Sequence, residues 1–311
     1  MNFNTPILII LFNRSNNTEQ LFESIKKLKP KKIYINIDGP RINNHNDITE
    51  VEKCKDIFSK IDWDCIIEKQ YHKENLGCKN SVISALNWIF EKEEKAIILE
   101  DDCIPCLSFF HFCNDMLIKY DDDKRVMQIS GSNFININNS DNCYFSSIND
   151  IWGWATWKRA WLMYDLQMKD HQKLIEQNIL FNYTKNNKIA NWLKIYIEDA
   201  LMPGSTTWST QWTYAMIKNN GLTIVPPKNL VENIGFTGSS THGQSNSWKH
   251  YSSFKANTIN NYKCPEFIYP NLFLDKLRYK LIRKTDPNLF LISKLKRFLK
   301  NILIKKINIF N

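Results

Sequence analysis

The stretch Ala96-Ile97-Ile98-Leu99-Glu100-Asp101-Asp102 places three consecutive carboxylates directly after an apolar run. The apolar run predicts a buried β-strand of the kind found in parallel sheets that are covered on both faces. Ligands of open α/β sheets bind outside the carboxyl ends of the strands, so this end of the strand is a candidate binding site. Three like charges repel one another, and their burial is costly without a cation nearby. A hard divalent ion facing an anionic substrate meets this need, whereas the alternative is a solvated acidic turn.

The sequence around this strand alternates strand and helix patterns. Strands are predicted over residues 7–12, 33–37 and 96–99, with a further strand beginning at 65–67. Apolar residues at helical spacing predict helices over residues 18–28, 48–61 and 81–90. Such alternation predicts an α/β fold with a mostly parallel sheet flanked by helices.

After residue 125 the pattern changes to short strands between polar loops. These strands are predicted over residues 126–129, 143–146 and 221–226, and helices over 190–202 and 211–219. A tryptophan-rich segment, Trp152-Gly153-Trp154-Ala155-Thr156-Trp157, lies between them, with Trp161 just beyond. Trp157 and Trp161 lie four residues apart, which predicts core positions on one helix face.

Seven short motifs follow one another along residues 5–245. They are Phe12-Asn13-Arg14-Ser15, Asp38-Gly39, His72-Lys73-Glu74-Asn75-Leu76-Gly77, Glu100-Asp101-Asp102, Gly153-Trp154, Trp208-Ser209-Thr210-Gln211-Trp212 and Thr241-His242-Gly243. In this order the chain resembles a GT-A-fold, nucleotide-sugar-dependent glycosyltransferase. It is most similar to N-acetylglucosaminyltransferase I and to the bacterial, family-2-like enzymes of surface-polysaccharide synthesis. The resemblance implies a Rossmann-like GT-A domain with a donor-binding half at 1–125 and an acceptor-binding half at 126–265.

The resemblance also implies roles for the donor-side residues. Glu100-Asp101-Asp102 resembles the DxD motif, in which Asp102 holds Mn²⁺ or Mg²⁺ while Glu100 and Asp101 orient the ribose and the donor sugar. The nucleotide-sugar-binding residues are then Asn13, Arg14, Asp38, His72, Glu100 and Asp101. Chemically, the Arg14 fork suits a diphosphate. Asp38 can accept the uracil imide hydrogen, and His72 can stack on the base. Taken singly, Arg14 is also compatible with a surface charge, Asp38 with a turn and His72 with a loop.

Acceptor binding is expected at Gly153, Trp154 and Gln211. Flat aromatic faces pack against sugar C–H faces, and glycine permits close backbone approach. The family's general base is a carboxylate in the segment that here reads Trp208-Ser209-Thr210-Gln211-Trp212, which has no acid. Three interpretations remain open. The base has moved to Glu198, Asp199 or Glu232; the chemistry is retaining or needs little base assistance; or the chain only binds.

The loop around Thr241-His242-Gly243 suits a mobile lid, with His242 as a further candidate metal or diphosphate ligand. A surface histidine is the alternative there.

The net charge of +9 comes from the C-terminal end of the chain. Between Lys276 and Lys306 there are eleven Lys or Arg residues and one acid, Asp286. Apolar residues at helical spacing among these cations predict a basic amphipathic helical tail over residues 266–311, suited to an anionic membrane surface. A helix docked on the core is the alternative. A charge confined to the tail argues against a nucleic-acid partner.

No signal peptide or membrane-spanning run is present in the sequence, and the eight cysteines are expected to be reduced thiols. We therefore expect a cytoplasmic protein, peripheral on the inner face of the cytoplasmic membrane. The resemblance implies a metal-dependent, inverting hexosyltransferase. It would use a nucleotide diphosphate sugar, UDP-linked by expectation, and a glycan or lipid-linked glycan of lipopolysaccharide, lipooligosaccharide or capsule. A catalytically inactive GT-A domain is the main alternative. A metal-dependent phosphoryl-transfer enzyme is less favoured, because no glycine-rich P-loop is present.

Overall fold

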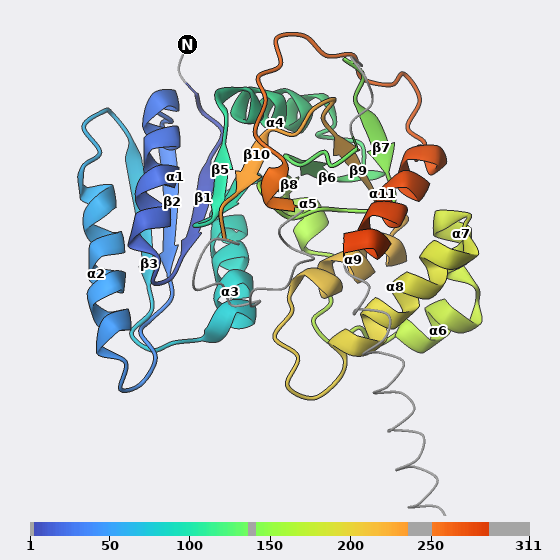
Figure 1. The fold of residues 1–311 in the computed structure, drawn as a ribbon, viewed down its shortest axis with the longest axis horizontal. Helices are drawn as coiled ribbons and strands as arrows, with labels where there is room; N and C mark the ends of the chain where they lie inside the picture. The colour runs from blue at the N-terminus through green and yellow to red at the C-terminus, as the bar shows by residue number, and fades with distance from the viewer. Residues whose placement is uncertain (1–2, 136–140, 236–250, 286–311) are drawn as a thin grey trace, which may run out of the picture.

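The computed structural model describes residues 3–135, 141–235 and 251–285. Within them an eight-stranded sheet runs in the order β3-β2-β1-β4-β8-β6-β9-β7 (Figure 1). Its strands are β1 Ile7–Leu11, β2 Lys32–Ile37, β3 Ile66–Tyr71, β4 Lys95–Glu100, β6 Val126–Ser130, β7 Tyr144–Ser146, β8 Trp154–Trp157 and β9 Leu222–Val225. β3, β2, β1 and β4 are parallel, and β6 is parallel to β9, whereas β8 and β7 are antiparallel to their neighbours. The mostly parallel α/β sheet predicted from the sequence is therefore confirmed.

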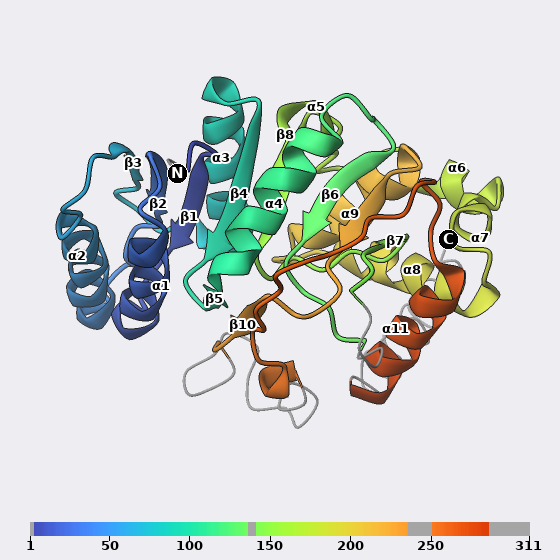
Figure 2. The same cartoon turned by 90° about the horizontal axis from the view of Figure 1, so that it is seen from above.

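Helices cover both faces of this sheet (Figure 2). They are α1 Ser15–Leu28, α2 His45–Ser59, α3 Gly77–Lys92, α4 Leu107–Lys119, α5 Lys158–Trp161, α6 His171–Glu176, α7 Ile179–Thr184, α8 Asn187–Ala200, α9 Ser209–Lys218 and α11 Leu272–Thr285, with a 3₁₀ turn η1 at Tyr251–Ser253. A second, two-stranded antiparallel sheet pairs β5 Cys103–Pro105 with β10 Val231–Asn233.

Successive side chains of a strand point to opposite faces, and β1 shows how this builds two cores. Ile7, Ile9 and Leu11 pack in the cluster that contains residues of α1, α2 and α4. Leu8 and Ile10 pack on the other face, with residues of α3 and α9. Each such side chain, fully removed from water, contributes roughly 1.5–3 kcal/mol. β1 is thus held from both sides, and the backbone at its carboxyl end is fixed in position.

The chain changes direction across β1. From β1 it runs outward through β2 to β3, and then α3 returns it to β4 on the opposite side of β1. The crevice between the carboxyl ends of β1 and β4 is therefore a topological switch point, where open α/β sheets bind ligands.

One local prediction is wrong. Trp157 was expected on a helix with Trp161, but it is the last residue of β8, paired with Lys95 of β4. Both tryptophans are buried, at 1% and 3% exposure, as the core interpretation requires. The spacing misled because β8 is buried on both faces and has no polar alternation to mark it as a strand.

The first part of the predicted tail belongs to the body of the molecule. Asp275 of α11 is buried and accepts hydrogen bonds from the hydroxyls of Ser146 and Ser147, the latter at 2.6 Å. Arg278 is also buried, pairs with Asp150 and lies over the Phe134 ring at 4.4 Å. Removing α11 would leave these partners unpaired, so a chain cut near residue 270 is not expected to fold normally. Residues 286–311 lie outside the described residues.

Within the described part of the chain, no helix combines the length and apolar character that crossing a membrane requires.

Candidate functional site

Arg14 meets two carboxylates at the switch point between β1 and β4. Its Nη1 lies 3.0 Å from Asp101 Oδ1 and 3.2 Å from Asp102 Oδ2. The register explains the encounter: Ile10 of β1 lies opposite Glu100 of β4, so the segments that leave the two strands emerge side by side. Three residues predicted for the donor site are therefore brought together from positions 87 and 88 residues apart.

The cluster has more negative than positive charge. Burial, reinforced by the charges of Asp102 and Asp101, raises the pKa of Glu100 to about 8. Burial also raises the pKa of Asp101 to about 7, although the Arg14 guanidinium opposes this rise. One guanidinium faces three carboxylates, so an additional cation would stabilise the ionised cluster.

The end of β10 packs directly on Asp102. Asn233 Nδ2 donates to Asp102 Oδ1 at 3.4 Å, and the Ile234 amide donates to the Asp102 carbonyl at 2.9 Å. A Cβ added to Gly235 would lie 2.3 Å from Asp102 Oδ2, so only glycine permits this approach. The sequence analysis missed Asn233 and Gly235. An Asn-x-Gly turn was visible, but nothing local indicated that it meets a carboxylate 131 residues earlier.

The donor set fits a divalent cation held by few protein ligands. Among the described residues, no three His, Cys, Asp or Glu side chains converge as a complete metal cage. Mg²⁺-type sites in nucleotide enzymes characteristically use one or two carboxylates together with substrate phosphates and water. Asp102, with an exposed fraction of 22% for its side chain, is suited to that role. His242, the other predicted ligand, lies outside the described residues.

Asp38 follows β2, as predicted, but its carboxylate is engaged by donors of the protein. Its Oδ1 accepts from the Gly39 and Leu76 amides at 2.9 and 2.8 Å. Its Oδ2 accepts from the Gly77 amide at 3.1 Å and from Asn75 Nδ2 at 3.0 Å. A carboxylate has about four acceptor positions, and these donors fill them. Asp38 therefore anchors the start of α3, and the structure does not support its predicted role as a uracil reader.

Asn13 is likewise engaged by the protein. Its Nδ2 donates to Asp47 Oδ1 at 2.7 Å, and Arg41 binds the same carboxylate through Nε and Nη2 at 2.6 and 2.8 Å. The Arg41 hydrogen bonds hold the pKa of Asp47 at about 2, against the opposing effect of burial. Asn13 thus ties the end of β1 to the start of α2.

His72 lines a hollow of about 280 Å³ beside α2 at the end of β3. Its Nε2 lies 3.1 Å from Asn36 Oδ1, which fixes the ring. The other lining residues include Pro40, Lys55 and Tyr71, and the Lys55 ammonium lies 5.3 Å from the centre of the Tyr71 ring. Lys55 also pairs with Glu52, another lining residue, at 2.6 Å, so its charge is balanced within the wall of the hollow. The aromatic rings of His72 and Tyr71 in this wall are suited to stacking on a neutral, planar nucleobase.

Of the residues predicted to bind the acceptor, Gly153 lies near the end of β4, but Trp154 is buried in the core. Gly153, with a φ of +61°, lies beside Leu99 and Val231, close to the end of β4. Trp154, in contrast, is 1% exposed, stacked on Trp208 with ring centroids 5.9 Å apart. Both of its faces are used by the core, so the structure does not support Trp154 as a sugar platform.

Gln211 and Glu232 do not face the carboxylates either. Gln211 is 1% exposed, buried in α9, and its carbonyl oxygen has no hydrogen-bond partner within the described structure. Glu232 alternates along β10 with Asn233, which bonds Asp102, so Glu232 points to the opposite face and pairs with Lys255. Glu232 therefore points away from Asp102, and this direction does not support its predicted role as the general base.

Glu198 and Asp199, the remaining candidates for the base, lie half-buried in the last turn of α8. Glu198 is within 4.0 Å of Lys194, one turn earlier on the helix.

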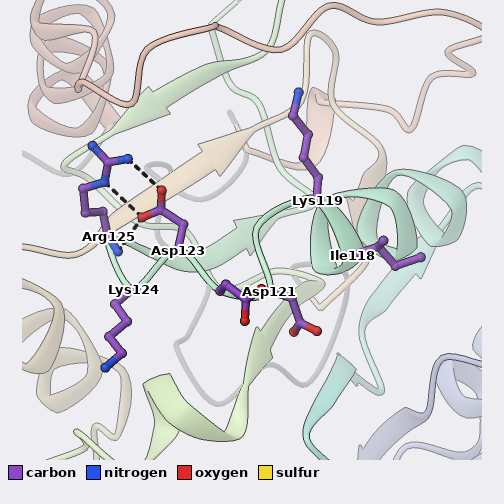
Figure 3. Close-up of a pocket in the computed structure, with 7 residues that line it drawn as sticks. Ile118, Lys119, Asp121, Asp123, Lys124 and Arg125 are labelled. Carbon is purple, nitrogen blue, oxygen red and sulfur yellow. Dashed lines mark hydrogen bonds and ion pairs between the residues drawn. The ribbon is translucent and has the colours of Figure 1, made fainter.

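A larger hollow of about 570 Å³ lies elsewhere and is not part of this site (Figure 3). It surrounds the turn between α4 and β6 and is lined by Ile118, Lys119, Asp121, Asp122, Asp123, Lys124 and Arg125. Lys95, the first residue of β4, binds Asp121 at 3.0 Å, which places the hollow at the amino end of that strand. Asp123 in its wall pairs with Arg125 at 2.7 Å.

No protein-family model matches the chain, and a search of curated proteins finds no relative. Solved structures with a similar arrangement include 4-diphosphocytidyl-2C-methyl-D-erythritol synthase from Anaerococcus prevotii, with 14% identity and a TM-score of 0.33 over 52% of this chain and 74% of that one. UDP-glucose pyrophosphorylase in complex with UDP-glucose has 8% identity and a TM-score of 0.30 over 52% and 79%. HddC from Yersinia pseudotuberculosis has 11% identity and a TM-score of 0.29 over 50% and 77%. At these low values the likenesses carry no argument about function.

Proposed function

We propose that the protein is a metal-dependent glycosyltransferase. It would move a sugar from a nucleotide diphosphate sugar, by preference UDP-linked, to a growing bacterial surface glycan with inversion at the anomeric carbon. The observation that carries this proposal is the meeting of Arg14 with Asp101 and Asp102 at the switch point between β1 and β4. A partly buried cluster of three carboxyl groups with one guanidinium is suited to a cation and a polyanion bound together.

Each donor-side residue has a task in this proposal. Asp102 would hold Mn²⁺ or Mg²⁺, which when bound neutralises the diphosphate leaving group. Arg14 would exchange part of its carboxylate pairing for phosphate oxygens, to which its planar fork binds with two parallel hydrogen bonds. Glu100 and Asp101 would accept hydrogen bonds from the ribose and the donor sugar. The hollow at His72 would receive the base.

The acceptor hydroxyl needs a proton acceptor during inversion. With Glu232 turned away and no acid at 209–211, we assign this task to Glu198 or Asp199 at the end of α8. Gly153 would let the acceptor approach the end of β4. Because lipid-linked acceptors are presented at the membrane, we place the protein on the inner face of the cytoplasmic membrane.

The test is release of UDP from a panel of UDP-sugars by the purified full-length protein with Mn²⁺. Asp102→Asn should abolish metal-stimulated release. Asp121→Asn, an equally conservative change beside the amino end of β4, should leave it intact. Equal activity of the native protein and Asp102→Asn would overturn the proposal.

A second candidate is a GT-A domain that binds a nucleotide sugar without turning it over. The observation that favours it is the absence of a carboxylate at residues 209–211, combined with the burial of Gln211. Metal-dependent UDP binding with no sugar release, from any donor or with any acceptor, would select this candidate.

A further inference from the structure

Four large apolar side chains are exposed in the segment that leads into α11. Phe267, Tyr269 and Phe273 have exposed fractions of 69%, 75% and 69%, and Leu272 has 42%. All four fall within seven residues of sequence, and the segment is tied to β7, since the Asn271 amide donates to the Phe145 carbonyl at 2.7 Å. Three exposed aromatic side chains within one short, anchored segment make this segment a candidate for an interaction surface.

The outer face of α11 continues this patch with positive charge. Phe273 is followed at helical spacing by Lys276, Lys280 and Lys284, all exposed. The opposite face holds Leu274, Asp275, Arg278 and Tyr279, all buried. Asp275 is the only acid in α11, so its buried position leaves the outer face without negative charge. We call Phe267, Tyr269, Phe273, Lys276, Lys280 and Lys284 the aromatic–basic face.

We propose that the aromatic–basic face is the surface by which the protein lies on an anionic lipid bilayer. Aromatic side chains settle at the level of the headgroups, and a helix with a cationic face lies in the plane of the interface. Each lysine held near an anionic surface strengthens binding about fivefold. The sequence after α11 contains six further cations and one acid over residues 286–311, which lie outside the described residues.

This surface is joined to the candidate site through the buried side of the same helix. Arg278 binds Asp150, three residues before Gly153, and its Nη1 donates to the Tyr251 hydroxyl at 3.0 Å. A bilayer held on the outer face of α11 would thus orient the acceptor side of the protein. The proposal stands on exposure and charge and does not require the transferase activity.

The experiment is co-sedimentation of full-length protein with vesicles of phosphatidylcholine, with or without phosphatidylglycerol. Native protein should bind the phosphatidylglycerol vesicles at low salt and leave them at high salt, because screening weakens charge attraction. Lys276→Glu with Lys280→Glu should lower the partition coefficient at least 30-fold. Phe267→Ser, Tyr269→Ser and Phe273→Ser together should lower it about 10-fold, without change in thermal stability, because all three side chains are exposed.

The matched control is Lys27→Glu with Lys69→Glu, which makes the same change in net charge on exposed lysines of α1 and β3. It should bind vesicles nearly as well as native protein. Equal losses in the control and in Lys276→Glu/Lys280→Glu would mean a net-charge effect only. Native-like binding by both face variants would mean that another part of the chain, or nothing, contacts lipid. Each of these two results would overturn the proposal. It would also be overturned if the protein bound an acidic protein or a nucleic acid through this face and did not bind lipid. UDP release measured on the same variants reports separately on the transferase.

Discussion

Site residues were predicted from the sequence in both halves of the sheet, but the structure brings together only some of those in the first half. In the donor half, Arg14, Asp101 and Asp102 follow two adjacent parallel strands and come together. In the acceptor half, Trp154 and Gln211 are buried in the core and Glu232 faces away. The register of β1 and β4 brings the residues that follow these two strands together. Trp154 and Glu232 lie within strands and Gln211 lies within α9, so the direction of each side chain depends on which face of its element is packed against the core. The predictions below test this contrast, from the largest expected effect to the smallest.

The largest effect is expected in the donor half. Asp102→Asn should keep the fold but lower metal-stimulated UDP binding and kcat/KM at least 100-fold, because a neutral amide is a far weaker ligand for a hard cation. Isothermal titration with UDP, with and without Mn²⁺, measures the binding. Asp101→Asn should weaken binding less. Retention of metal dependence in Asp102→Asn would remove the main support for the donor site.

In the acceptor half, Trp154→Ala should act on stability and not on acceptor recognition. Loss of a buried tryptophan that stacks on Trp208 should lower the free energy of unfolding by about 3–5 kcal/mol. Denaturation in urea measures this, with the half-buried Trp63→Ala as a milder comparison. Trp154→Phe, which keeps most of the packing, should leave the acceptor KM unchanged. A raised KM in a stable Trp154→Phe protein would restore the sugar-platform role.

Asp38→Asn should behave like a core change although it lies beside the donor site. The buried carboxylate accepts from the amides of Leu76 and Gly77, and an amide side chain cannot accept at both oxygens, so we expect a loss of about 2 kcal/mol. Asp64→Asn, an exposed acid paired with Lys31, is the control. If Asp38→Asn instead kept its stability and lost a preference for UDP over GDP and ADP, Asp38 would read the base after all.

The raised pKa values of Glu100 and Asp101 predict a modest pH dependence of stability. Both carboxyls bind protons more tightly in the folded state than in the unfolded chain. Their contribution to stability is therefore complete below about pH 4 and is lost as the pH rises through about 7 to 8. Urea denaturation from pH 5 to 8 should show falling stability. Asp102→Asn should flatten this fall, because the Asp102 charge helps to raise both pKa values. Stability that rises over this range would show that the cluster is solvated.

The smallest effect is expected for Glu232→Gln. Its pair with Lys255 is partly exposed, so the free energy of unfolding should change by no more than about 0.5 kcal/mol, with turnover unaltered. Glu198→Gln and Asp199→Asn, assayed for UDP release with acceptor present, are the informative comparison. A collapse of turnover in Glu232→Gln alone would make Glu232 the base and would show that the acceptor half rearranges when substrate binds.

The same contrast separates the features that could be predicted from the sequence from those that could not. The alternation of strands and helices and the position of the carboxylates were readable, because apolar runs and helical spacing are local properties. The direction of the Asp38 carboxylate was not, since it depends on the Leu76 and Gly77 amides nearly forty residues later. Nor was the contact of Gly235 with Asp102, which is set by the pairing of β10 with β5. The docking of α11 was the less favoured alternative for the same reason, because nothing near Asp275 in the sequence indicates its contact with the hydroxyls of Ser146 and Ser147.

β8 has a consequence for the way the protein is made. It is the only strand of the described sheet that pairs with both β4 and β6, and it is synthesised more than fifty residues after β4. Until then β4 presents an unpaired apolar edge beside an otherwise complete layer of β1, β2 and β3. A nascent chain that pauses on the ribosome before residue 154 is synthesised would therefore be prone to aggregation through the edge of β4. We expect chaperone dependence, and truncation products that aggregate, to concentrate in chains ending between residues 100 and 154.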